Sequence, residues 1–105
     1  MDEAQTYAWI MYALAGASQN EPASFRAISL VADGINHAVP THKEIQSSLK
    51  WLMACGFVHN QGSGYLLTDQ GCAVMAAARS GHNTVSKVWA SLTRTLSAYP
   101  GLSSY

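Results

Sequence analysis

The stretch from Pro40 to Thr68, PTHKEIQSSLKWLMACGFVHNQGSGYLLT, constrains the fold of this chain more than any other. Thr41 and Glu44 have the spacing of a capping box, in which each side chain bonds the other residue's backbone N–H, so a helix is predicted to begin here. Apolar residues then recur at helical spacing. This pattern predicts a helix from about His42 to Cys55, and its inward residues are Ile45, Leu49, Leu52 and Met53.

A glycine stop and two short strands are predicted after this helix. Gly56 stands where the end of a helix favours a residue that tolerates positive φ. The segments 57–60 and 65–67 flank Gln61-Gly62-Ser63-Gly64, a sequence typical of a hairpin loop. Thr68 can then cap the next helix. The stretch therefore predicts a helix, a two-stranded hairpin and the start of another helix.

Helical spacing elsewhere predicts four further helices, over about 3–17, 25–36, 69–79 and 84–98. The first of them is apolar nearly all round, and a helix of that kind needs cover on several sides. It is either the central helix of the core or a helix whose Trp9 and Tyr12 meet a second subunit. Pro100 and Gly101 are expected to end the last helix and to leave a loose tail.

The pattern VPTHKEIQSSLKWLMACGFVHNQGSGYLLTDQG resembles a common bacterial winged-helix signature. The matching residues are Glu44, Ile45, Leu49, Leu52, Gly56, Phe57, Val58, Tyr65, Leu67, Thr68 and Gly71. With the first two helices, the resemblance covers roughly residues 5 to 78. It implies a mainly α fold, a winged helix-turn-helix with a three-helix core, a two-stranded β wing and two additional C-terminal helices. A single domain is expected over 1–105, with its winged-helix core at about 5–67 and its C-terminal helices at about 68–99.

The resemblance also implies a function, that of a small winged-helix DNA-binding protein and transcriptional regulator acting as a homodimer. In such families the helix before the wing enters the major groove of double-stranded DNA. The residues expected to face DNA are His42, Lys43, Gln46, Ser47 and Lys50. Gln can read adenine and Lys can read guanine, whereas Ser accepts either base.

The composition favours an alternative, a winged-helix protein–protein interaction or assembly module without DNA binding. Charged residues make up only 11% of the chain and the formal net charge is zero. DNA-binding domains usually carry a basic excess, because phosphate contacts supply most of their non-specific affinity. The predicted wing loop 61–64 has no Lys or Arg. A surface with so little charge also favours self-association.

A homodimer is predicted because a helix added after the wing often pairs with the first helix in this architecture. The residues expected at the dimer interface are Trp9, Tyr12, Val85, Trp89, Leu92 and Leu96. Trp51 lies off the inward stripe of its helix. It is expected either to be covered by one of the last two helices or to form a surface for another protein.

Motifs for other chemistries are absent from the sequence, so we expect no enzyme activity, catalytic residue, metal site or cofactor. Gly62-Ser63-Gly64 lacks the glycine and lysine of a phosphate-binding loop. No G-x-S-x-G nucleophile motif occurs. Cys55 and Cys72 are too far apart for a CxxC motif and are expected to be buried free thiols.

The apolar run from Tyr7 to Ala17 bears on the cellular compartment. At about eleven residues it is too short to span a bilayer. Acidic rather than basic residues, Asp2 and Glu3, precede it, which argues against a signal peptide. We therefore expect a cytoplasmic protein without a membrane partner.

Overall fold

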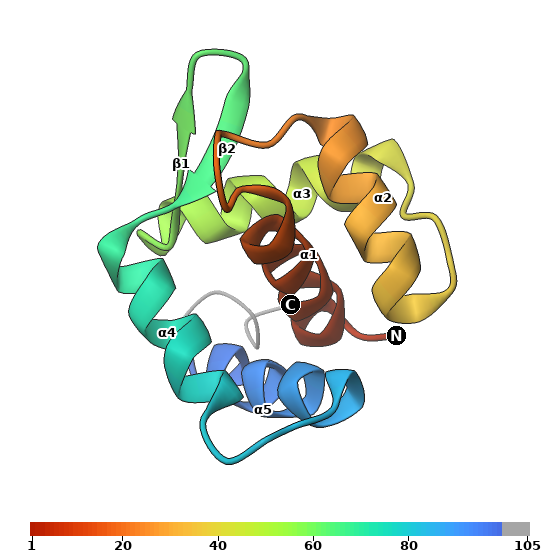
Figure 1. Ribbon diagram of the computed structural model, residues 1–105, viewed down its shortest axis with the longest axis vertical. Coiled ribbons are helices and arrows are strands. Elements are labelled where there is room, and N and C mark those ends of the chain that lie inside the picture. The colour runs from red at the N-terminus through yellow and green to blue at the C-terminus, as the bar shows by residue number, and fades with distance from the viewer. Residues whose placement is uncertain (100–105) are drawn as a thin grey trace.

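The computed structural model describes residues 1–99, within which the chain forms five helices and one hairpin (Figure 1). The elements are α1 (Glu3–Ala17), α2 (Phe25–Asn36), α3 (His42–Ala54), β1 (Val58–Gln61), β2 (Gly64–Leu67), α4 (Asp69–Arg79) and α5 (Val85–Ser97). Each boundary lies within one residue of the predicted one, and Thr84 caps α5. The expectations for Pro100, Gly101 and the tail lie outside the described residues.

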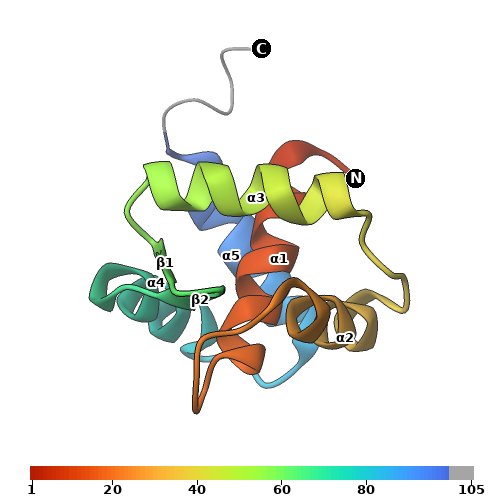
Figure 2. The same cartoon turned by 90° about the horizontal axis from the view of Figure 1, so that it is seen from above.

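Helix α1 is the centre of the molecule. In Figures 1 and 2, α2, α3 and α5 lie around it. A capping box between Asp2 and Gln5 begins the helix. Its buried residues are Ala4, Ala8, Trp9, Ile10, Met11, Ala13 and Leu14. A helix that is apolar on nearly all sides is stable only when other elements cover it, and the structure confirms the interpretation of this helix as the core helix.

The wing is an antiparallel hairpin in which Val58 pairs with Leu67 and Gln61 with Gly64. Ala23, in the connection between α1 and α2, forms a single bridge beside β2. The Ala23 N–H donates to the carbonyl of Tyr65 at 2.8 Å, and the Tyr65 N–H donates back at 2.9 Å. The layout is that of a winged helix-turn-helix domain followed by two further helices, as predicted.

Two glycines of the signature fix how the hairpin leaves α3 and enters α4. Gly56 has φ +83°, which few other residues adopt. Its carbonyl accepts a 2.6 Å hydrogen bond from the Thr68 hydroxyl, the cap of α4. A Cβ at Gly71 would lie 2.1 Å from the carbonyl oxygen of Phe57. Any side chain at this position would therefore push α4 away from the hairpin.

Several side chains lie differently from the sequence expectation. Met53 was predicted to face inward but is 37% exposed. Ser48 was given no role and is completely buried. The prediction of two buried thiols is wrong for Cys72, which is exposed, whereas Cys55 is half-buried; both are free. Within residues 1–99, no helix combines the length and apolar character needed to cross a membrane.

Candidate nucleic-acid interface

The outward face of α3 carries all five residues that the sequence assigns to DNA. His42, Lys43, Gln46, Ser47 and Lys50 are each exposed. Residues three, four and seven apart lie on the same side of a helix, so the five form one polar stripe. With a rise of 1.5 Å per residue, the stripe from Lys43 to Lys50 is about 10 Å long. Figure 2 shows α3 along its whole length in front of α1 and α5.

The opposite face of α3 holds this stripe in place. Ile45, Leu49 and Leu52 are at most 3% exposed and belong to the hydrophobic core. At the start of the helix, the Thr41 N–H donates to Glu44 Oε1 at 2.8 Å. The Glu44 N–H donates to Thr41 Oγ1 at 3.0 Å. The predicted capping box is therefore present, and it satisfies two backbone donors at the end of the helix.

His42 is the member of the stripe with a defined aromatic neighbour. Its ring lies 4.9 Å, centroid to centroid, from the ring of Phe25 at the start of α2. Phe25 in turn lies 5.8 Å from the ring of Tyr65 in the wing. These contacts connect α2, α3 and β2 beside the exposed stripe. The wing therefore has a fixed position relative to the outward face of α3.

Acidic side chains flank the basic end of the stripe. A hollow of about 260 Å³ separates the beginnings of α1 and α3, and Asp2, Glu3, Lys43, Glu44 and Ser47 all border it. Three acidic side chains and one lysine therefore border the same hollow. Lys50 stands two turns farther along α3. The electrostatic potential along the stripe is consequently less positive than two lysines alone would give.

Ser48 borders the same hollow and is a residue that the sequence interpretation missed. Its Oγ is buried without a hydrogen-bond partner in the structure. The position could have been found from spacing, because Ser48 follows the buried Ile45 by three residues and therefore lies on the same side of α3.

Trp51 is partly covered by α1, a helix that was not expected to contact it. Its ring stacks on that of Tyr7, with centroids 4.7 Å apart and planes inclined by 15°. Tyr7 of α1 therefore covers one face of the Trp51 ring. Trp51 is half-buried, and the stacked pair joins α1 to α3.

The predicted dimer residues divide into two groups. Trp9, Leu92 and Leu96 are at most 2% exposed, so the expectation that they meet a second subunit is wrong for this arrangement of the chain. They pack in the chain's own core, where α5 lies against α1, and the indole N–H of Trp9 donates to the carbonyl of Ala32 at 2.9 Å. Surface remains on three of the predicted residues, namely Tyr12, Val85 and Trp89.

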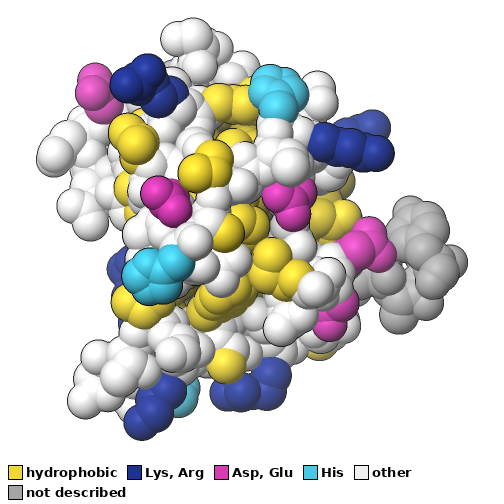
Figure 3. Space-filling model, turned by 90° about the vertical axis from the view of Figure 1, so that its right-hand side faces the viewer, with side chains coloured by type: hydrophobic (Ala, Val, Ile, Leu, Met, Phe, Trp, Pro, Cys, Tyr) yellow, Lys and Arg dark blue, Asp and Glu magenta, His cyan; other side chains and the backbone are white. Residues whose placement is uncertain are grey.

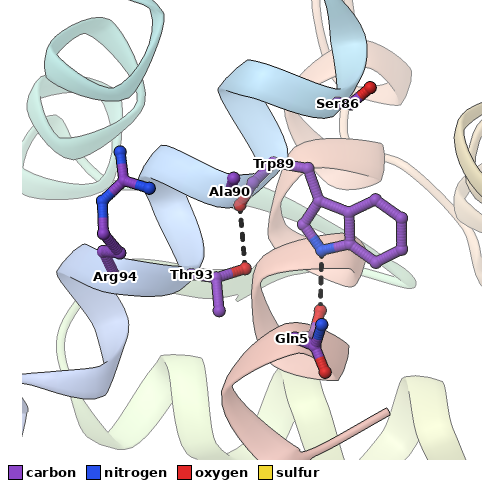
Figure 4. A pocket seen from close by; sticks show the side chains of 6 residues that line it. All are labelled: Gln5, Ser86, Trp89, Ala90, Thr93 and Arg94. Carbon is purple, nitrogen blue, oxygen red and sulfur yellow. Dashed lines mark hydrogen bonds between the residues drawn. The ribbon is translucent and has the colours of Figure 1, made fainter.

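Trp89 forms one wall of a shallow hollow of about 330 Å³ between α5 and the start of α1 (Figure 4). Its indole N–H donates to the carbonyl of Gln5 at 2.9 Å, and the Thr93 hydroxyl donates to the carbonyl of Trp89 at 2.8 Å. Arg94 points away from Trp89 in Figure 4. The hollow therefore offers a ring face but no converging set of polar groups.

Several large apolar side chains are exposed outside α3. Met1, Leu30, Val39 and Val85 are 61%, 65%, 68% and 46% exposed. Met1 precedes α1, Leu30 lies in α2, Val39 lies in the loop before α3 and Val85 begins α5. Figure 1 draws these four segments on the right-hand side of the molecule. Figure 3 views that side and shows hydrophobic side chains across its middle with charged groups around them. We call these four residues the α2 face.

Other site chemistry has little support among residues 1–99. No group of three or more His, Cys, Asp or Glu side chains is placed to hold a metal ion in this part of the chain. Burial raises the pKa of the Cys55 thiol, so less of the reactive thiolate is present at neutral pH. Comparison of the chain with protein-family models, curated proteins and solved structures gives no match.

Proposed function

We propose that the protein is a small winged-helix DNA-binding protein that acts as a transcriptional regulator in the cytoplasm. The observation that supports this most is the division of α3 into a buried apolar face and an exposed face with His42, Lys43, Gln46, Ser47 and Lys50. None of the five belongs to the hydrophobic core, although the His42 ring lies against Phe25. A helix of this kind beside a wing suits insertion into a major groove.

The side chains of the stripe determine which DNA groups can be contacted and how strongly the affinity depends on salt. Lys43 and Lys50 supply the phosphate contacts, and Gln46 supplies a donor and an acceptor for an adenine edge. Two phosphate contacts per chain give a salt dependence with a logarithmic slope of about −2, since each neutralised phosphate contributes about −0.9. The expected affinity is therefore modest and strongly reduced at physiological salt.

Retention of the purified protein on a pool of fragmented DNA, at low salt and near physiological salt, tests this proposal. Lys43→Ala and Lys50→Ala should each weaken retention and reduce the slope by about 1. Lys87→Ala on α5, which removes an equal charge outside the stripe, is the matched control and should leave the slope unchanged. Absence of retention at low salt would overturn the proposal.

A second candidate function is a protein-interaction module, and the exposed α2 face favours it. In this form of the proposal the partner is a second copy of the chain. The net charge is zero and charged residues are few, so electrostatic repulsion between two copies is weak. Val85, which was predicted at the dimer interface, belongs to this face. The proposed homodimer interface therefore includes the start of α5, whereas the buried residues Trp9, Leu92 and Leu96 remain in the core of each copy.

Sedimentation analysis over a range of concentrations tests the homodimer. Leu30→Asp and Val39→Asp should give monomers, because each places a charge in the α2 face. Met53→Asp is the control, since Met53 is exposed on α3 outside this face. A monomeric wild-type protein at high concentration would exclude a homodimer, and equal dimerisation of all variants would move the interface away from the α2 face.

A further inference from the structure

A groove separate from the stripe of α3 and from the α2 face lies between α1, β2 and α4. Its volume is about 360 Å³, which is within the range of small-molecule sites. The apolar residues along it are Ala15, Leu66, Leu67, Cys72, Met75 and Ala76. Segments that are distant in the sequence therefore converge on one concave surface.

Most of the residues that line the groove are apolar, and Ser18 and Gln19 add two polar side chains at the end of α1. Met75 is 2% exposed and gives the groove a packed base, whereas Leu66 and Leu67 are half-buried and keep part of their surface open. No aromatic side chain lines the groove. Aliphatic surface of this kind is stabilised when a flexible hydrocarbon chain covers it, because apolar area leaves water.

Arg79 gives the groove its charge. It is the one charged residue among the described residues that line it. Its guanidinium carbon lies 5.8 Å from the centroid of the Tyr12 ring, and within residues 1–99 the guanidinium has no ion pair or hydrogen bond. A guanidinium above a ring keeps its in-plane N–H donors available, and their fork matches a carboxylate.

We propose that this groove binds a small amphipathic carboxylate with an aliphatic chain. The carboxylate would accept hydrogen bonds from Arg79 in the last turn of α4. The chain would run along α4 towards Cys72 and over Leu66 and Leu67 of the wing strand. The distance along the helix axis from residue 79 to residue 72 is about 10 Å, which suits a medium-length chain rather than a compact ion.

NMR titration of the ¹⁵N-labelled protein with octanoate tests the proposal. The largest shifts should occur at the amides of Ala15, Leu66, Leu67 and Ala76. Octanol, which has the same chain without the charge, should bind about tenfold more weakly, because charge-assisted hydrogen bonds are the stronger class. Arg79→Gln should weaken octanoate binding by a similar factor and leave octanol unaffected. The matched control, Arg94→Gln on α5, should change neither.

Alkylation of Cys72 provides a second measurement. Cys72 is exposed and lines the groove, whereas Cys55 lies outside it, so bound octanoate should slow the alkylation of Cys72 alone. Equal affinity for octanoate and octanol, largest shifts outside the groove, or no saturable binding would each overturn the proposal. Shifts of the groove amides with protein concentration alone would assign the groove to a second copy and would also overturn it. Neither measurement uses DNA, so the outcome is independent of the proposed regulator function.

Discussion

The two faces of α3 differ in burial and in chemistry, although they belong to one helix. On the inward face, Ile45, Leu49 and Leu52 are buried in the core. On the outward face, Lys43, Gln46 and Lys50 are exposed. Burial of apolar surface is the main source of stability, whereas exposed polar side chains contribute little to it. The fold therefore depends on the inward face and leaves the outward face free to serve a function.

The same comparison applies to the surface as a whole. The stripe of α3 is polar and is flanked by acidic groups, while the α2 face consists of exposed apolar side chains with charged groups around them. Neither surface is needed for the core, which the inner sides of all five described helices form with the hairpin. Substitutions on each surface should therefore change binding without changing stability.

Leu49→Ala should produce the largest loss of stability on α3. The side chain is 1% exposed, so its removal leaves a cavity and should lower the free energy of unfolding by about 2–5 kcal/mol. Urea denaturation followed by circular dichroism measures this loss. The neighbouring Lys50→Ala is the control, and a similar loss in both variants would contradict the division into two faces.

Thr41→Ala should have an intermediate effect. It removes the hydroxyl that accepts from the Glu44 N–H at 3.0 Å and should cost about 1 kcal/mol. Thr41→Ser keeps that oxygen and should retain most of the stability. The same denaturation experiment compares them, and equal destabilisation by Ala and Ser would show that the cap contributes nothing measurable.

The stacked rings of Tyr7 and Trp51 should contribute a smaller coupling between α1 and α3. A double-mutant cycle with Tyr7→Leu and Trp51→Leu should give an interaction free energy of about 0.5–1.5 kcal/mol. Additive effects of the two substitutions would mean that the rings are adjacent without stabilising each other.

Lys43→Ala and Lys50→Ala should have the smallest effects on folding. Both side chains are exposed, and each substitution should change the free energy of unfolding by less than about 0.5 kcal/mol. Thermal unfolding of the two variants and the wild type measures this. A loss of more than 1 kcal/mol would show that the outward face has a structural role.

The helices and the hairpin could be predicted from sequence because local signals agree there. Thr41 and Glu44 mark the start of α3, Gly56 marks its end, and apolar periodicity gives its inward face. Packing between distant segments could not be predicted in the same way. Spacing places Trp51 off the stripe of α3, but only the fold shows that Tyr7 covers it.

For the candidate sites, too, local sequence patterns predict exposure but not the contacts between distant segments. Exposure of the five residues on α3 follows from helical geometry and was predicted. Periodicity identifies Trp9, Leu92 and Leu96 as apolar positions but does not say whether their own chain or a partner covers them. The groove beside Arg79 joins α1, β2 and α4, so no local pattern indicates it.

NMR mapping with a short mixed-sequence DNA duplex at low salt is the most direct test of the proposed regulator function. We predict the largest amide shifts at His42, Lys43, Gln46, Ser47 and Lys50, with smaller ones in the wing loop 61–64. These shifts should decrease in Lys43→Ala and as salt is raised. Absence of shifts, or shifts centred on Leu30 and Val39 instead, would contradict DNA binding through α3.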